Sequence, residues 1–196
     1  MQRIGVLALQ GDVSEHVTAL EKAMQGRGGR GEVVEIRRPG QMEQCQALVL
    51  PGGESTAIFR QLERSGLTEE LNAAAISGKP ILATCAGLVL VSKEIEGDSR
   101  VKPLGLMDIR ISRNAFGPQK ESFEADLEIV GLERPYRAVF IRAPAIAEVG
   151  NGVQVLAKVG DAVVAVRQKS LLALAFHPEL TDDLRIHQLF LEMLED

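Results

Sequence analysis

The sequence is poor in three kinds of feature, and each shortage limits what the chain can be. Its 196 residues include only two cysteines, Cys45 and Cys85, so no disulfide framework can support the fold. The longest unbroken apolar run, 171–176, has six residues, whereas a membrane-spanning helix needs about 20. Acidic residues outnumber basic ones by 27 to 22, and the resulting net charge of -5 disfavours nucleic-acid binding. We therefore expect a protein that neither spans a membrane nor binds nucleic acid.

The overall composition is that of a globular protein. Hydrophobic residues make up 45% of the chain and charged residues 25%, close to the average for such proteins. At about 100–200 residues per domain, the length predicts one domain over residues 1–196. The first residues contain no long apolar stretch and no small-residue cleavage pattern, so we expect no signal peptide. The expected location is the cytoplasm, with both cysteines as free thiols.

Strands and helices alternate in the first half of the sequence. Short apolar runs predict buried strands at 4–9, 33–36, 47–50 and 81–83. Helical periodicity separates these runs, and this order predicts a parallel sheet with helices on both faces. Asp12 and Glu15 have the spacing of a capping box, which predicts a helix start there. Four glycines within 26–31 predict a loop.

The second half, from Met107 to Phe176, is rich in short β-type runs separated by glycine-containing turns. The runs lie at 127–130, 138–141, 153–159, 162–168 and 171–176. We expect them to form antiparallel strands that extend the same sheet. A last helix is expected from about Thr181, because apolar residues recur at helical spacing up to Leu194.

Cys85 stands among small residues at a predicted strand-to-helix turn, Thr84-Cys85-Ala86-Gly87. This context is typical of a nucleophile elbow, in which a strained turn lifts one side chain above the edge of the sheet. The free N–H groups and positive partial charge of a helix N-terminus also favour a thiolate. The alternative is a buried cysteine that acts only as a small hydrophobic residue.

A histidine and a glutamate follow the last predicted strand directly, in the motif His177-Pro178-Glu179. The carboxyl ends of strands are where open α/β sheets place their sites. His177 can act as general base to a thiol, and Glu179 can accept a hydrogen bond from the other ring nitrogen. The two remaining histidines, His16 and His187, fall within helical patterns, and we interpret them as structural residues.

A Pro-Gly-Gly turn follows another predicted strand, in the stretch Pro51-Gly52-Gly53-Glu54-Ser55-Thr56. Glycines permit backbone shapes that turn N–H groups toward a developing oxyanion. One alternative is a tight turn whose following helix is capped by Ser55 or Thr56. Another is a phosphate-binding loop, although the lysine and spacing of a Walker motif are missing.

Taken together, these motifs resemble the class I (triad) glutamine amidotransferases. The chain is most similar to the family of glutaminase subunits of the two-component pyridoxal 5'-phosphate synthase. The resemblance covers nearly the whole chain, and the stretches specific to that family lie at 4–11, 113–117, 121–124, 140–144 and 176–181. It implies a flavodoxin-like three-layer α/β/α sandwich with a mixed, mainly parallel sheet.

The resemblance also implies a role for each motif. Cys85 would attack the glutamine side-chain amide, His177 would take and return the proton, and Glu179 would orient His177. The N–H groups of Gly53 and Ala86 would form the oxyanion hole. The implied glutamine-binding residues are Gly53, Glu54, Ser55, Arg113, Ile141 and Arg142.

The implied reaction is hydrolysis of L-glutamine to L-glutamate and ammonia through a thioester, with no metal and no other cofactor. The ammonia would pass to a synthase subunit that makes pyridoxal 5'-phosphate, in an assembly where glutaminase subunits decorate a synthase double ring. Two alternatives stay open. One is another cysteine hydrolase, such as a peptidase, on a similar fold. The other is a non-catalytic regulatory relative, against which the intact Cys85, His177 and Glu179 argue.

Overall fold

The computed structural model describes residues 2–28, 31–113, 116 and 122–195, and its centre is a ten-stranded mixed sheet. The strands of this sheet are β1 (Gln2–Leu7), β2 (Gly31–Ile36), β3 (Ala47–Leu50), β4 (Ile81–Thr84), β5 (Glu94–Ile95), β6 (Ile109–Ser112), β9 (Ala145–Val149), β10 (Gln154–Val159), β11 (Ala162–Gln168) and β12 (Leu171–Leu174). Their order is β2-β1-β3-β4-β12-β11-β9-β6-β5, with β10 paired to β11 outside this path. The first five strands of the order are parallel, as the alternation in the sequence predicts.

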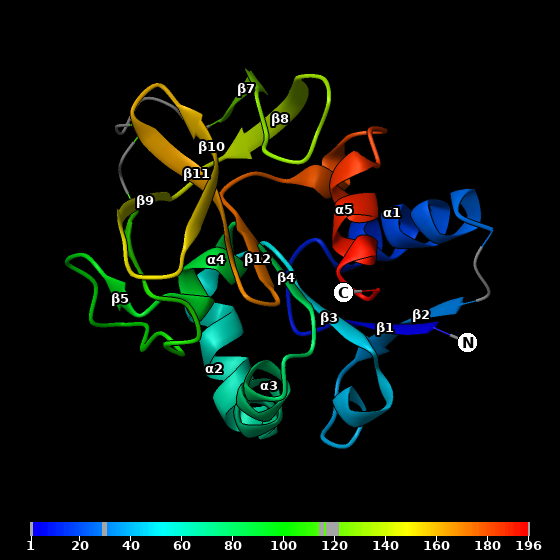
Figure 1. The fold of residues 1–196 in the computed structure, drawn as a ribbon. Helices are drawn as coiled ribbons and strands as arrows, with labels where there is room; N and C mark the ends of the chain where they lie inside the picture. The colour runs from blue at the N-terminus through cyan, green and yellow to red at the C-terminus, as the bar shows by residue number, and fades with distance from the viewer. Residues whose placement is uncertain (1, 29–30, 114–115, 117–121, 196) are drawn as a thin grey trace.

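Helices cover both faces of the parallel part of the sheet (Figure 1). They are α1 (Val13–Gly26), α2 (Ser55–Ser65), α3 (Leu67–Ile76), α4 (Ala86–Val91) and α5 (Arg185–Glu192), with short 3-10 helices η1 (Met42–Gln44) and η2 (Pro178–Leu180). Helices α1 and α5 pack together on one face, and α2 packs with α3 and α4 on the other. The expected three-layer α/β/α fold is confirmed. Across the described ranges, no helix combines the length and the apolar character that crossing a membrane requires.

The sheet brings separate parts of the sequence to one edge. Strands β1, β3, β4 and β12 run parallel side by side, so their carboxyl ends lie together. All four strands are apolar and largely buried, as the short runs predict, and they hold the loops that follow them in place. Those loops carry Asp12, Gly52, Cys85 and His177. Residues that are far apart in the sequence are thereby placed around one site.

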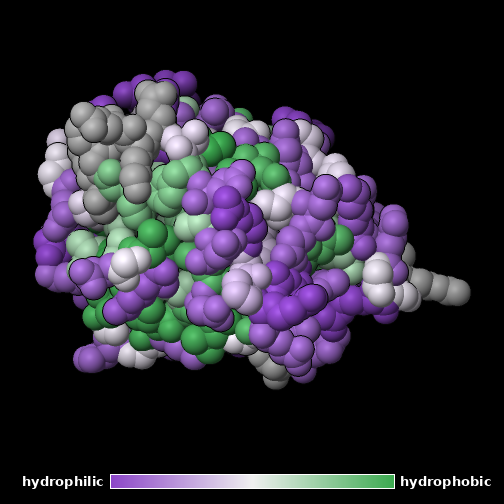
Figure 2. Space-filling model, turned by 90° about the horizontal axis from the view of Figure 1, so that it is seen from above, coloured by the Kyte–Doolittle hydropathy of each residue, from purple (hydrophilic) through white to green (hydrophobic). Residues whose placement is uncertain are grey.

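Seen from above, the two halves of the molecule differ in character (Figure 2). Hydrophobic residues gather in the left half, whereas the right half, where α1 and α5 lie in Figure 1, is mainly hydrophilic. The top centre of Figure 1 holds a separate two-stranded sheet formed by β7 (Ser122–Leu127) and β8 (Tyr136–Ile141).

This second sheet corrects the expectation that every later strand extends the main sheet. Among the described residues, strands β7 and β8 pair only with each other. The Phe123 and Phe140 rings stack at 4.6 Å within this small sheet. Strand β8 contacts the segment after β12, since Phe140 meets Phe176 edge-on at 5.6 Å. Of the apolar run at 127–130, only Leu127 belongs to a strand.

Several predicted boundaries also move. The strand expected at 171–176 ends at Leu174, and the last helix begins at Arg185 rather than near Thr181, because η2 and a turn occupy the residues between. The glycine-rich loop expected at 26–31 is shorter than predicted, since α1 continues through Gly26 and β2 begins at Gly31. Residues 29–30 of that loop lie outside the described part of the chain.

Candidate active site

Cys85 occupies a strained turn between β4 and α4. Its φ of 47° lies in the left-handed region, which residues other than glycine seldom adopt. The turn is fixed from both sides, because the Cys85 N–H donates to the carbonyl of Leu174 at 2.8 Å and its own carbonyl accepts from Val89 at 3.3 Å. Strain that is fixed in this way is common at functional sites. The structure thus places Cys85 at the strand-to-helix turn that the sequence predicts.

The small residue Gly87 allows this turn to pack closely. A Cβ at Gly87 would lie 2.2 Å from the carbonyl oxygen of Leu50, the last residue of β3. The start of α4 therefore fits against the end of the neighbouring strand only without a side chain at this position. The Cys85 thiol is 3.8 Å from the carbonyl oxygen of Ile141 on β8 and lies beside His177.

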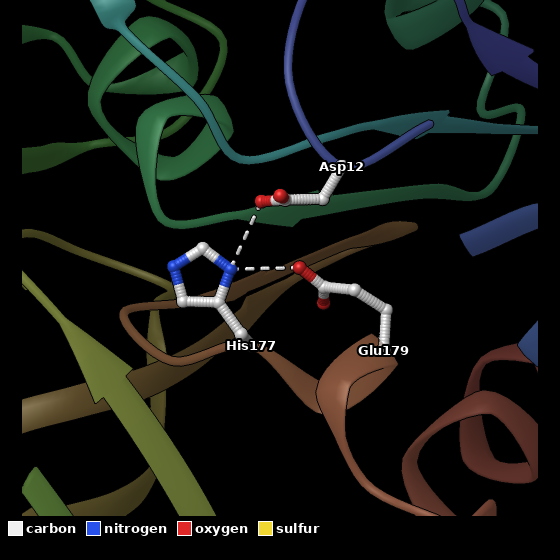
Figure 3. A group of neighbouring side chains, drawn as sticks. All are labelled: Asp12, His177 and Glu179. Carbon is white, nitrogen blue, oxygen red and sulfur yellow. Dashed lines mark hydrogen bonds and ion pairs between the residues drawn. The ribbon is translucent and has the colours of Figure 1, made fainter. Parts of the chain in front are cut away.

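His177 and Glu179 form a buried hydrogen-bonded pair (Figure 3). Nδ1 of His177 lies 2.7 Å from Oε1 of Glu179, and the two side chains are 5% and 0% exposed. The His177 backbone N–H donates to the carbonyl of Val139 on β8, which fixes the loop after β12. Within the described residues, Nε2 of His177 has no hydrogen-bond partner. Nδ1–H therefore donates to Glu179, which leaves Nε2 as the ring nitrogen that can accept a proton.

Charge favours the protonated form of His177. Burial alone would lower the pKa of this imidazole, but the neighbouring Asp12, Cys85 and Glu179 side chains outweigh burial and raise the pKa. Burial raises the pKa of the Glu179 carboxyl, and the hydrogen bond to His177 acts in the opposite direction. The site is therefore suited to hold an imidazolium, the form that a histidine takes once it has accepted a proton.

A second carboxylate, Asp12, approaches the same ring nitrogen. Its Oδ2 lies 3.3 Å from Nδ1 of His177, and its side chain is 32% exposed (Figure 3). The capping box expected from Asp12 and Glu15 is therefore wrong in its detail. Asp12 is the N-cap residue of α1 but makes no side-chain capping bond, because its carboxylate turns to His177. The signal that could reveal this role is its place after β1, at the same sheet edge as the predicted site.

The ligand atoms of Asp12, His177 and Glu179 lie within 4.8 Å of one another, a spacing that a metal ion could bridge. The shortest of these separations, between Nδ1 of His177 and Oε1 of Glu179, indicates that the two atoms share a hydrogen-bonded proton rather than a metal ion. Ligands at about 2.0–2.2 Å from a tetrahedral metal stand roughly 3.3 Å apart, whereas Nδ1 and Oε1 are 2.7 Å apart. That is the length of a strong hydrogen bond.

The Pro-Gly-Gly turn after β3 packs against both His177 and the loop after β1. A Cβ at Gly52 would lie 2.7 Å from Cε1 of His177, so the imidazole rests directly on this glycine. Gly53 has a φ of 144°, a conformation that favours glycine. Gln10, in the loop after β1, holds the turn in place, since its Oε1 accepts the N–H of Glu54 at 2.8 Å. Ala86, whose N–H is the other expected oxyanion donor, is the first residue of α4.

The expected glutamine-binding residues lie beside this turn. Glu54, rather than Ser55 or Thr56, caps α2, because its carboxylate accepts the N–H groups of Thr56 and Ala57. Ser55 accepts a hydrogen bond from Nη2 of Arg113 at 2.9 Å. Nη1 of the same guanidinium forms a 2.9 Å ion pair with Asp98, a residue that the sequence pattern does not single out.

The other expected contacts come from β8 and from the segment after β6. Ile141 ends β8 and is 39% exposed, and Arg142 follows it with a φ of 44°. Arg142 thus directly follows the residue whose carbonyl faces Cys85. The family-specific stretches 113–117 and 121–124 fall partly outside the described residues, at 114–115, 117 and 121.

Comparison with known proteins agrees with this geometry. Residues 6–196 match the SNO glutamine amidotransferase family. The chain belongs to this family. A relative from Methanothrix thermoacetophila, named "Pyridoxal 5'-phosphate synthase subunit PdxT", is 58% identical over 98% of this chain and 100% of its own length. A protein of the same name from Methanosarcina mazei is 54% identical over 97% of each chain.

Solved structures of glutamine amidotransferases share the fold of this SNO family member. One is 43% identical, with a TM-score of 0.87 over 98% of this chain and 99% of its own. Another, from Thermotoga maritima, is only 11% identical but still reaches a TM-score of 0.65 over 99% and 96% of the two chains. The fold is therefore retained where most of the sequence has changed.

Proposed function

We propose that this chain hydrolyses L-glutamine to L-glutamate and ammonia through a thioester on Cys85, with His177 and Glu179 completing the triad. The observation that carries the proposal is the buried pair of His177 and Glu179 beside a cysteine held in a strained turn. Membership of a glutamine amidotransferase family supplies the substrate class.

The proposed steps use groups that the site already holds. The Cys85 thiol gives its proton to Nε2 of His177, and Sγ attacks the side-chain amide carbon of glutamine. The N–H groups of Gly53 and Ala86 stabilise the oxyanion that forms. His177 then protonates the amide nitrogen, which leaves as ammonia, and water hydrolyses the thioester to glutamate. Glu179 keeps the imidazole oriented and stabilises its charge throughout.

The carboxylate of the bound glutamine requires a cation, and we assign it to the arginines beside the site. Arg113 already spans Ser55 and Asp98, which fixes its guanidinium next to Glu54. Arg142 directly follows Ile141, whose carbonyl faces Cys85. A guanidinium matches a carboxylate with two parallel hydrogen bonds. Ser55, Glu54 and Gly53 then complete the substrate site on the turn.

The partner is inferred from the relatives. Proteins that cover almost the same length as this chain are named subunits of pyridoxal 5'-phosphate synthase. We propose that ammonia passes to a synthase subunit and that glutaminase subunits sit on a synthase double ring. Since Gln10 links the loop after β1 to the turn that carries Gly53, it offers a path by which docking changes the oxyanion hole.

Ammonia release from glutamine, measured with and without the synthase, tests the proposed function. We expect turnover that depends on Cys85 and rises when the synthase is added. Cleavage of peptide bonds without any turnover of glutamine contradicts the proposal and favours a peptidase.

Gln10→Ala tests the coupling. We expect it to reduce stimulation by the synthase more than it weakens glutamine binding, because it frees the Glu54 N–H. Gln46→Ala is the matched control, since Gln46 also accepts a backbone N–H, from Arg3 at 2.7 Å, but lies before β3 at the opposite sheet edge. If the isolated chain already turns over glutamine at the rate of the complex, the oxyanion hole is preformed and this coupling is wrong.

A further inference from the structure

A third histidine, His16, lies directly behind the triad. It projects from α1 and is fully buried. Its Nε2 is 3.0 Å from the hydroxyl of Thr84 and 3.2 Å from Oε2 of Glu179, the oxygen that does not face His177. Thr84 is the last residue of β4 and immediately precedes Cys85. One ring nitrogen therefore touches both the acid of the triad and the strand that carries the nucleophile.

The contacts of His16 define where its proton lies. Burial, followed by the neighbouring His187 and His177, lowers the pKa of His16 well below its ordinary value, so the ring is neutral. A bare lone pair on Nε2 would face the carboxylate oxygen of Glu179 at 3.2 Å and repel it. Nε2 therefore carries the hydrogen and Nδ1 carries none. Nδ1 has no hydrogen-bond partner among the described residues, as this tautomer of a buried ring leaves it.

We propose that His16 is a positioning residue whose ring, hydrogen-bonded to Thr84 and 3.2 Å from Oε2 of Glu179, holds the Glu179 carboxylate aimed at His177. Among the described residues, this Oε2 makes no hydrogen bond, so His16 Nε2 is the polar group that faces it. Burial favours the neutral form of this carboxyl, so a donor facing its far oxygen opposes that tendency. Because the same nitrogen contacts Thr84, the last residue before Cys85, it also fixes the position of Glu179 relative to Cys85.

The other charged and titratable groups around Glu179 do not replace this contact. His177 engages the opposite oxygen, Oε1. The negative charge of Asp12 raises the pKa of Glu179 rather than lowering it. The Tyr136 hydroxyl interacts with Thr181 and with the carbonyl of Asp183. His187 meets His16 ring to ring, at 5.8 Å between centroids, and neither of its nitrogens makes a hydrogen bond in the described part of the chain.

Kinetics of three variants, measured in the complex with synthase, test the proposal, and this arm rests on the proposed glutaminase function. His16→Phe keeps a buried ring but removes the donor, whereas His16→Gln keeps an N–H group near the position of Nε2. His187→Phe is the matched control, because it changes a histidine of the same buried cluster that makes no hydrogen bond to the triad.

We expect His16→Phe to lower kcat about ten- to a hundredfold, the range for loss of a polar partner beside a charged group, with little change in KM. The acid limb of its pH profile should move to higher pH, because Glu179 then protonates more readily. His16→Gln should recover most of the rate, and His187→Phe should retain the wild-type profile. A wild-type kcat and pH profile in His16→Phe, or equal losses in His16→Phe and His187→Phe, overturns the proposal.

NMR of the ¹⁵N-histidine-labelled wild-type chain gives a readout that needs no turnover and no variant. The proposal requires His16 to be neutral and protonated on Nε2, and His177 to show a downfield Nδ1–H signal from its hydrogen bond to Glu179. A His16 ring protonated on Nδ1 refutes the proposal. If the NMR result is as expected but the complex does not release ammonia from glutamine, the positioning role stands and the proposed function fails.

Discussion

The contact between Gly52 and His177 gives a sharp test of how the site is built. Gly52→Ala adds one methyl group, whose carbon would lie 2.7 Å from Cε1 of His177 and 3.0 Å from Oδ2 of Asp12. Ordinary contacts begin at 3.4 Å, so the imidazole would have to move by about 0.7 Å. Such a movement would disturb the 2.7 Å hydrogen bond between Nδ1 of His177 and Oε1 of Glu179.

The expected cost follows from this displacement. Misplacing a catalytic group by about 1 Å can reduce the rate by about 10²-fold, or roughly 2.7 kcal/mol of transition-state stabilisation. We therefore expect Gly52→Ala to lower kcat for glutamine by about two orders of magnitude. The KM should change less than kcat, since the atoms that the added methyl group meets belong to His177 and Asp12 rather than to the expected glutamine-binding residues.

Ammonia release by the complex with synthase is the assay, and Gly26→Ala is the matched control. Neither glycine lies in the left-handed region, and a Cβ at Gly26 meets nothing within 4 Å. Gly26→Ala should therefore keep the wild-type rate. Thermal unfolding of both variants checks that the fold is intact. A folded Gly52→Ala variant with wild-type kcat would show that the position of His177 does not limit the reaction.

Three further predictions concern single side chains. Cys85→Ala should abolish glutamine hydrolysis and Cys45→Ala should leave it largely intact; activity in the Cys85 variant, measured as ammonia release, rules out the nucleophile assignment. Glu179→Gln should retain more activity than His177→Asn, because the first loses orientation and the second loses the proton carrier; the reverse order in folded variants shows that the roles are exchanged. Burial lowers the pKa of His187 to about 4. Below a pH of about 6.5, His187 therefore binds a proton in the unfolded chain but stays neutral in the folded chain. The free energy of unfolding consequently falls as the pH drops toward 4. His187→Phe should flatten this fall in chemical denaturation at a series of pH values, and an unchanged slope contradicts the assignment.

Much of the architecture could be predicted from local patterns. Apolar runs bounded by turns identify β3 and β11 with the bounds that the structure shows. The positions of Cys85 and His177 directly after buried strands also follow from the sequence, because parallel strands bring such ends to one edge. The family assignment rests on motifs around these same positions and is confirmed.

The rest depends on contacts between distant residues. Asp12 has the sequence context of a helix cap, and only the fold shows that its carboxylate faces His177 instead. His16 has the spacing of a buried helical residue, which it is, but its partner Glu179 lies 163 positions away in the numbering. Asp98 reaches Arg113 in the same way, from a loop with no periodic pattern. Burial can be read from spacing, whereas the partner of a buried polar group cannot.

The central claim is that Cys85 forms a thioester with the substrate, and mass spectrometry of the complex tests it most directly. Glutamine is added to the glutaminase with its synthase, the reaction is quenched in acid during turnover, and the peptide that contains Cys85 is analysed. The account predicts a peptide that carries one glutamyl group on Cys85 in the wild-type chain and more of this adduct in Glu179→Gln if hydrolysis of the thioester is slowed. Ammonia release without any glutamyl adduct on Cys85, or with the adduct on another residue, contradicts the account.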